Sequence, residues 1–283
     1  MCPQCRAFIT SDDKICPYCD TKQGARAVDR RLPDALLGGL LPADRMVTML
    51  LLMVNTALYA ATLIVTLQSG GMAGGGGMLG IGTIDSATLT KFGANVFLFV
   101  NAGQWWRLVT AGFLHISLIH VAMNMWSLFS IGAMVEEIFG TSRMTAIWIV
   151  STITGFGASF YINHGFSAGA SAGLFGLIGA MIAFGVQHKT SAFAQAAKSA
   201  FLQTAAINLV IGFMGYFPID NWAHIGGLAG GFGVAMLSGI DNKDGGLRDR
   251  VWHWVSIACI LLTAFSFWKA VQFSGALASL RSL

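Results

Sequence analysis

The sequence predicts an all-α, polytopic membrane protein: a six-helix core, one extra C-terminal transmembrane helix and a small zinc-binding head at the N-terminus. Composition is the first reason, because 55% of the 283 residues are hydrophobic and only 11% are charged, whereas about a quarter are charged in a typical soluble domain. The second reason is a series of seven apolar runs, each near the roughly 20 residues that a helix needs to span a bilayer. The third is a pair of cysteine turns ahead of the first run.

Residues 1–31 have the pattern of a zinc-ribbon-like head followed by a basic linker. Cys2 and Cys5 form one Cys-Pro-x-Cys turn, and Cys16 and Cys19 form a second. Each turn directs two thiolates at one centre, so the two turns complete a tetrahedral site typical of structural zinc. So short a segment cannot bury a core, and the metal would have to supply its folding energy. Two disulfides or a redox pair are the alternatives, and the cytosolic placement argued below favours zinc.

The apolar runs predict the transmembrane helices. The first six define a core at residues 32–240, and residues 241–283 hold a turn on the cytosolic side and the seventh helix. The runs cover residues 46–67, 116–138, 144–162, 171–187, 200–215, 222–239 and 252–273.

Basic residues predict the orientation of these helices. With the N-terminus inside the cell, thirteen of the 17 Lys and Arg residues lie in inside segments, and four lie in outside segments or at the outer end of the last helix. This distribution satisfies the positive-inside rule. We therefore expect a cytosolic head, which a cytosolic protein partner could bind, and a C-terminus outside. The expected location is the plasma (inner) membrane of a prokaryotic cell.

A long connection, residues 68–114, follows the first run on the outer side. Its glycine cluster, residues 70–82, has no Gly-Lys-Ser/Thr after it and no strand before it, so we interpret it as a flexible linker rather than a phosphate-binding loop. Residues 92–114 are amphipathic and include Trp105 and Trp106. This pattern predicts a segment that lies in the outer membrane interface.

Two polar side chains within the apolar runs suggest chemistry. Ser171 opens the fourth run among small residues, where it could be a helix-packing or N-cap serine, or a nucleophile. His224 lies in the sixth run, and Gly227 and Gly231 share its helix face. Such a glycine stripe permits close contact between helices. It would let the Ser171 hydroxyl approach the His224 ring.

A second group of polar residues opens the second run. His120 and Asn124 are four residues apart and share one helix face, whereas His115, five residues before His120, is expected to point elsewhere. Because ionisable and polar groups within a membrane are costly, each of them calls for a functional explanation.

These residue types suit peptide hydrolysis. An imidazole can accept the proton of a serine hydroxyl and return it to the leaving amine. The oxyanion of the tetrahedral intermediate needs donors, which the Asn124 amide, a His120 N–H and the Ser171 backbone N–H would supply. No Asp or Glu lies in the outer halves of these helices. We therefore predict a Ser171–His224 dyad that needs no cofactor, with Phe175, one turn after Ser171, packing against the imidazole.

Over residues 46–240 the chain resembles the rhomboid intramembrane serine proteases. The motifs that carry the resemblance are Trp106-Arg107, the HxxxxHxxxN run at His115, His120 and Asn124, the run from Gly132 through Glu136 and Gly140 to Arg143, Gly169-x-Ser171, and HxxGxxxG at His224. The resemblance implies a six-helix core around a water-filled cavity open to the outer face. It also implies that the substrates are single-span membrane proteins in the lipid bilayer, cut at small residues near the outer membrane boundary.

The chain departs from this family pattern at Ala172, where many members have glycine after the nucleophile. The main alternative is a non-catalytic membrane chaperone or scaffold that uses the same fold to bind transmembrane helices. A transporter is disfavoured because the chain has no repeat, no pair of broken half-helices and no charged pathway, and no nucleic-acid partner is expected. We expect Glu136 and Arg143 to anchor the cytosolic end of the core, and Trp106 and Arg107 to be structural.

Overall fold

The computed structural model describes residues 19, 45–70, 81–216, 218–240 and 246–281, with side chains through residue 274. The chain divides into two compact units, Met1–Ala43 and Asp44–Leu283. Of the predicted zinc ligands only Cys19 lies in the described part, where it is half-buried. Cys2, Cys5 and Cys16 lie outside it, as do the basic linker and most of the predicted glycine-rich linker. The zinc head therefore stays a prediction.

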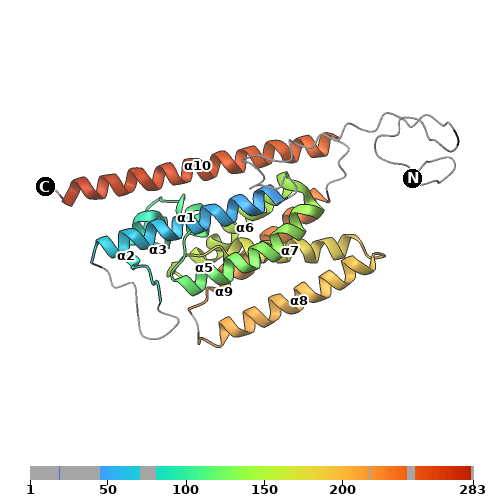
Figure 1. Cartoon of the computed structure of the whole chain (residues 1–283), viewed down its shortest axis with the longest axis horizontal. Helices are drawn as coiled ribbons and strands as arrows, with labels where there is room; N and C mark the ends of the chain where they lie inside the picture. The colour runs from blue at the N-terminus through green and yellow to red at the C-terminus, as the bar shows by residue number, and fades with distance from the viewer. Residues whose placement is uncertain (1–18, 20–44, 71–80, 217, 241–245, 282–283) are drawn as a thin grey trace. The chain divides into compact units, whose positions relative to one another are not determined.

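The second unit is a set of packed helices with one two-stranded ribbon (Figure 1). The predicted all-α class is thus supported in the described part of the chain. The elements are α1 (Met46–Gln68), α2 (Ser86–Phe92), β1 (Asn95–Val96), α3 (Phe97–Asn101), α4 (Arg107–Thr110), the 3₁₀ turn η3 (Ala111–Phe113), α5 (Leu118–Ser127), the π-helical turn η4 (Leu128–Gly132), α6 (Ala133–Ile162), β2 (Phe166–Ser167), α7 (Ser171–Gln187), α8 (Ala192–Phe213), α9 (Asn221–Ser238) and α10 (Leu247–Arg281).

Four helical stretches of the described chain are long and apolar enough to cross a membrane, namely Met46–Gln68, Leu118–Ile162, Ala192–Phe213 and Leu247–Ser274. The apolar helix α7 is shorter, at 17 residues. Each predicted run lies largely within a helix. Helix α9, however, is not among the four stretches that are both long and apolar enough to cross a membrane. The chain is therefore a multi-pass membrane protein, and the total of six plus one spans stays a prediction.

The second and third predicted spans follow each other without a loop in the helical stretch α5–η4–α6, which is kinked at Gly140. The Gly140 backbone has φ 76° and ψ 162°, and glycine adopts this positive φ without steric cost. The kink falls between the two runs that the sequence predicts, 116–138 and 144–162, so it is the place where the chain can change direction without an intervening loop.

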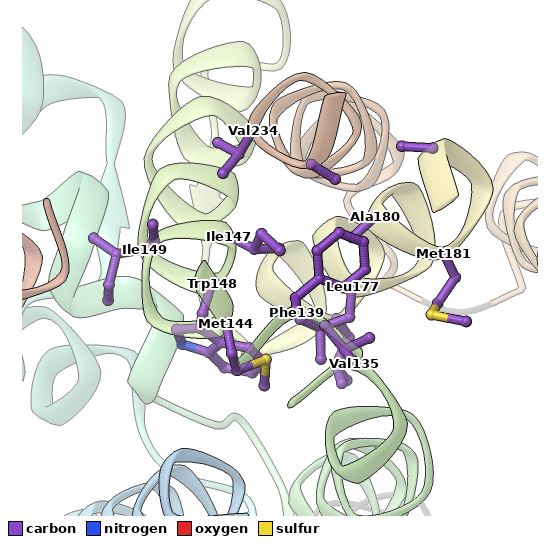
Figure 2. Packing of buried hydrophobic residues seen from close by; sticks show 14 of the residues in the cluster. Val135, Phe139, Met144, Ile147, Trp148, Ile149, Leu177, Ala180, Met181 and Val234 are labelled. Atoms are coloured by element: carbon purple, nitrogen blue, oxygen red, sulfur yellow. The ribbon is translucent and has the colours of Figure 1, made fainter. Parts of the chain in front are cut away.

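Helix α7 lies at the centre of the unit, packed against α6, α8 and α9. Every residue from Ala172 to Gly185 is buried. Figure 2 shows Leu177 and Ala180 of α7 among Phe139, Ile147 and Trp148 of α6. An apolar helix is buried all round in this way when it forms the core of a larger bundle.

Helices α7 and α9 approach each other closely enough for their backbones to touch. A Cβ atom added to Gly231 would overlap the carbonyl group of Gly176, and one added to Gly227 would overlap the carbonyl oxygen of Ala172. The close contact that the glycine stripe predicts is therefore present. Ala172, the departure from the family pattern, is fully buried, and its methyl group faces Gly155 of α6, where an added Cβ would lie 2.8 Å from it.

The two charged residues expected to anchor the core do so. Glu136 is buried and accepts hydrogen bonds from the backbone amides of Val47 and Thr48, both at 2.8 Å, and from the Thr48 hydroxyl at 2.7 Å. It thereby satisfies the free N–H groups at the start of α1. Arg143 forms a 2.6 Å ion pair with Asp249 of α10. Both residues join helices, as expected.

Residues 92–114, the predicted amphipathic segment, form several short elements. They contain β1, α3, α4 and η3, and Val109, Phe113 and Leu114 are buried in the protein. The Arg107 side chain is fully buried and donates hydrogen bonds to the carbonyl groups of Thr90 and Ala94. The segment is therefore a folded part of the core, and its placement in the membrane interface stays a prediction.

Candidate active site

Ser171 is the first residue of α7, as predicted, and its side chain is half-buried. The preceding residues leave the ribbon at Ser167 and reach the helix through Gly169. The Gly169 amide donates a 3.0 Å hydrogen bond to the Ala111 carbonyl. The loop that presents the hydroxyl is therefore held at both ends.

Gly169 brings two of the predicted site residues to one point. Its φ of +151° is at the edge of the region that side chains rarely adopt. A Cβ built on Gly169 would lie 2.8 Å from Cε1 and 3.0 Å from Nε2 of His120, and 3.6 Å from the Ser171 hydroxyl oxygen. The His120 ring and the Ser171 hydroxyl therefore border the same small space, which a larger residue would fill.

His224 lies one turn into α9, after Asp220, which caps the helix by accepting a 3.1 Å hydrogen bond from the Ala223 amide. The imidazole is buried and stacks on the Phe175 ring, with 4.0 Å between ring centroids and 11° between ring planes. Phe175 is one helical turn after Ser171, so both side chains project from the same face of α7. This stack places His224 on the Ser171 side of the helix pair.

None of these contacts is the hydrogen bond through which Ser171 would pass its proton to His224. Among the described residues no hydrogen bond joins Ser171 to His224, and the His224 Nδ1 atom has no hydrogen-bond partner there. Catalytic hydrogen bonds often tighten only when substrate binds. The pairing of the two residues stays a prediction.

Helix α5 carries two of the three predicted oxyanion donors, His120 and Asn124. Ser117 caps this helix and accepts a 3.4 Å hydrogen bond from the His120 amide. Asn124, one turn later, is buried, and its Nδ2 atom has no hydrogen-bond partner in the described chain. A buried amide that lacks a partner is costly unless something else uses it. The donor is thus available for a ligand.

His115 differs from the prediction that it points away from His120. Its ring is fully buried and contacts the His120 ring edge to face, with 5.2 Å between centroids and 67° between planes. Helix α5 begins only at Leu118, so helical spacing does not apply to His115 and the preceding chain can fold back. Ser117, a recognisable N-cap three residues before His120, is the sequence signal that could have located this boundary.

Within the described part of the chain no three His, Cys, Asp or Glu side chains gather closely enough to hold a metal ion. The site around Ser171 therefore offers hydroxyl, imidazole and amide groups. Such groups can bind and polarise a carbonyl and move a proton between oxygen and nitrogen.

Comparison with known proteins shows what this region of the chain is similar to. Residues 102–239 match the model of the rhomboid domain. The chain is 36% identical over 185 residues to the rhomboid protease GluP of Bacillus subtilis, covering 65% of this chain and 35% of that protein. It is 40% identical over 158 residues to the mitochondrial RHOMBOID-like protein 6 of Arabidopsis thaliana, covering 54% and 50% of the two chains. RHOMBOID-like protein 1 of the same plant is 40% identical over 174 residues, or 58% and 43%.

The chain spans about a third to a half of the length of these relatives. The matched region contains every residue of the site described above, from His115, just before α5, to His224 on α9. Residues 102–239 of this chain are therefore similar to the rhomboid domain.

Proposed function

We propose that the chain is an intramembrane serine endopeptidase that cuts transmembrane proteins through a Ser171–His224 dyad. The observation that carries the proposal is the convergence at Gly169: the Ser171 hydroxyl and the His120 ring border one space, and His224 is stacked on Phe175 one turn away. A nucleophile, a base and donors on three different helices have no common structural purpose that would bring them together.

In the proposed reaction the Ser171 oxygen attacks the carbonyl carbon of the scissile bond while His224 takes the hydroxyl proton. The oxyanion that forms is stabilised by the Asn124 amide, a His120 N–H and the Ser171 backbone N–H. His224 then returns the proton to the amine, which leaves. Water attacks the acyl carbonyl while His224 takes a proton from the water, and the Ser171 oxygen leaves with that proton as the carboxylic acid is released. Phe175 keeps the imidazole in the plane that both transfers need.

The proposed substrates are single-span membrane proteins, cut near the outer face of the membrane. Support comes from the position of Ser171 at the start of an apolar helix whose residues from Ala172 to Gly185 are buried and from the basic residues that predict this end to be outside. The proposed location is the plasma membrane of a prokaryotic cell, with a cytosolic N-terminus.

A non-catalytic scaffold that binds transmembrane helices is the second candidate. The exposed apolar side chains on α5 and α8, such as Met123, Trp126, Ile207 and Val210, would serve either function. A scaffold would not need the Ser171 hydroxyl, whereas the protease does.

The test compares the wild-type protein with Ser171→Ala in membranes that contain a reporter with one transmembrane helix. We expect cleavage by the wild type alone, and labelling of Ser171 by a fluorophosphonate probe. Ser130→Ala is the matched control, since this serine is on the same helical stretch as His120 but its hydroxyl is exposed and donates to the Trp126 carbonyl at 3.0 Å. Equal cleavage by wild type and Ser171→Ala would replace the protease with the scaffold.

For the N-terminal segment we propose one structural zinc ion held by Cys2, Cys5, Cys16 and Cys19. The support is the spacing of the four cysteines. The ion would stabilise a head too small to fold by burial alone, and this head would be free to bind a cytosolic protein.

A further inference from the structure

The C-terminal helix α10 contacts the segment that follows α2 through charged and aromatic side chains. The Arg107 guanidinium carbon lies 5.3 Å from the centroid of the Phe273 ring and 4.8 Å from that of Phe99. The two rings contact each other edge to face at 5.7 Å. The Ser274 hydroxyl donates a 2.6 Å hydrogen bond to the Lys91 carbonyl. This end of α10 is therefore bonded to chain that precedes it by well over 150 residues.

A second group of contacts lies one to two turns earlier in α10. The Lys269 ammonium nitrogen is 5.8 Å from the centroid of the Trp106 ring. The Phe265 ring stacks on Trp105, with 6.0 Å between centroids and 22° between planes. Contacts of a cation with an aromatic face strengthen when they are removed from water. Phe265, Lys269 and Phe273 are spaced four residues apart on one face of α10. Through them α10 contacts Trp105, Trp106 and Arg107 in turn.

Arg107 transmits this hold to the chain before β1. Its Nη1 atom donates hydrogen bonds of 2.8 Å to the carbonyls of Thr90 and Ala94, and the Thr110 hydroxyl donates one of 2.6 Å to Gly93. Burial lowers the pKa of Arg107 to about 10, so the guanidinium is still charged at neutral pH. A fully buried charge with several acceptors fixes the backbone around it.

The chain after this turn is paired with the loop that leads to Ser171. In the ribbon, Asn95 of β1 lies opposite Ser167 of β2, and the strands run antiparallel. The Phe97 amide donates a 3.2 Å hydrogen bond to the Gly165 carbonyl, and the Gly169 amide donates one to Ala111. Residues 165–169, which end two positions before Ser171, therefore depend on the segment that α10 holds.

We propose that α10 positions the loop that presents Ser171. Phe273 holds Arg107, Arg107 holds the turn before β1, and β1 holds residues 165–169. Phe273 and Arg107 are positioning residues, because neither touches the reacting atoms. The effect of α10 on catalysis rests on the proposed protease function. If the proposal holds, α10 is needed to position the site and is not only an additional membrane helix.

The first test is hydrogen exchange of residues 165–170 in the full-length protein in detergent micelles. In Phe273→Ala we expect these amides to exchange roughly tenfold faster, because the buried Arg107 guanidinium loses an aromatic contact and the segment that pairs with them is loosened. Phe273→Tyr keeps the ring and should restore the wild-type rate. Val271→Ala is the matched control, since this side chain is on α10 but 70% exposed.

Exchange at the wild-type rate in Phe273→Ala would overturn the proposal. So would an equal effect of Phe273→Ala and Val271→Ala, which would indicate a general loosening of α10. This measurement requires no enzymatic activity, so it decides on the role of α10 even if the wild-type protein neither cleaves the reporter nor reacts with the probe.

The second test measures kcat and KM for the membrane reporter. A misplaced nucleophile slows the chemical step and leaves binding intact. We therefore expect kcat of Phe273→Ala to fall roughly tenfold or more while KM changes little, with recovery in Phe273→Tyr. A change in KM alone would assign α10 to substrate binding and contradict the proposal. Failure of the wild type and of every variant would instead count against the protease function.

Discussion

The rings of Phe175 and His224 lie face to face, 4.0 Å apart and 11° from parallel, and so join α7 to α9 at the level of the site. A stacked ring limits the rotation of the imidazole, whose Nδ1 atom has no other partner among the described residues. The orientation of the proposed base thus depends on an apolar neighbour rather than on a carboxylate.

Replacement of Phe175 by leucine should lower kcat roughly tenfold, because a base that rotates spends less time aimed at the hydroxyl. The measurement is reporter cleavage, together with thermal unfolding to follow stability. Phe184→Leu is the control: Phe184 is on the same helix, is buried and contacts the ring of His188 at 4.7 Å between centroids. An equal loss of kcat in both variants would show that packing alone is responsible.

The residues of the proposed dyad should be strongly non-additive. Ser171→Ala and His224→Ala should each abolish cleavage, and the double variant should be little worse than either, because the two side chains act as one unit. Asn124→Ala should keep some activity, with a loss on the order of 10²–10³, since two other donors remain. Probe labelling of Ser171 should also collapse in His224→Ala. Additive losses in the double variant would contradict the dyad.

Loss of the Glu136 carboxylate should destabilise the protein by about 2–4 kcal/mol, because three donors at the start of α1 lose their acceptor. The midpoint of thermal unfolding of Glu136→Ala in detergent tests this. Its neighbour Glu137 is exposed, and Glu137→Ala should shift the free energy of unfolding by no more than about 0.5 kcal/mol. Equal shifts in the two variants would rule out the capping role.

Two glycines of α9 should respond oppositely to alanine. In Gly231→Ala the new methyl group would overlap the Gly176 carbonyl, and backbone cannot move aside as a side chain can, so we expect a loss of about 2–3 kcal/mol or failure to fold. A Cβ at Gly233 meets no atom within 4 Å, so Gly233→Ala should be neutral or stabilise the helix by up to about 1 kcal/mol. A tolerated Gly231→Ala would contradict the close packing of α7 and α9.

The proposed head should contain one zinc ion per chain. Metal analysis of protein purified under non-oxidising conditions measures it, and Cys5→Ser should reduce the content because a ligand is lost. Cys259→Ser is the control, since this cysteine is buried in α10 and far along the chain. Zinc-free protein with intact disulfides would contradict the zinc site.

The sequence was sufficient for the features that depend on local pattern. Apolar runs predicted where helices lie, and the glycines at positions 227 and 231 predicted the close contact of α9 with its neighbour. The helix that begins at Ser171 was predictable because the residues after Ser171 are small or apolar and none is charged. Each of these is a property of one stretch of chain, which periodicity can reveal.

The sequence was insufficient where distant chain segments meet. Helical spacing predicted that His115 points away from His120, but the helix starts only after Ser117 and the rings are in contact. Residues 92–114 were recognised as amphipathic, but the pattern did not predict that Arg107 bonds to carbonyls 13 and 17 residues before it. The periodicity of a segment does not reveal which distant carbonyl groups its side chains will bond to.

The contact of Glu136 with α1 sets an order of assembly during synthesis. The amides of Val47 and Thr48 are made 89 and 88 residues before the carboxylate that accepts from them. Until that residue has been added to the nascent chain, the start of the first membrane helix must be solvated by water or by lipid headgroups. The start of this first membrane helix is therefore completed only after Glu136 has been synthesised and has packed against it.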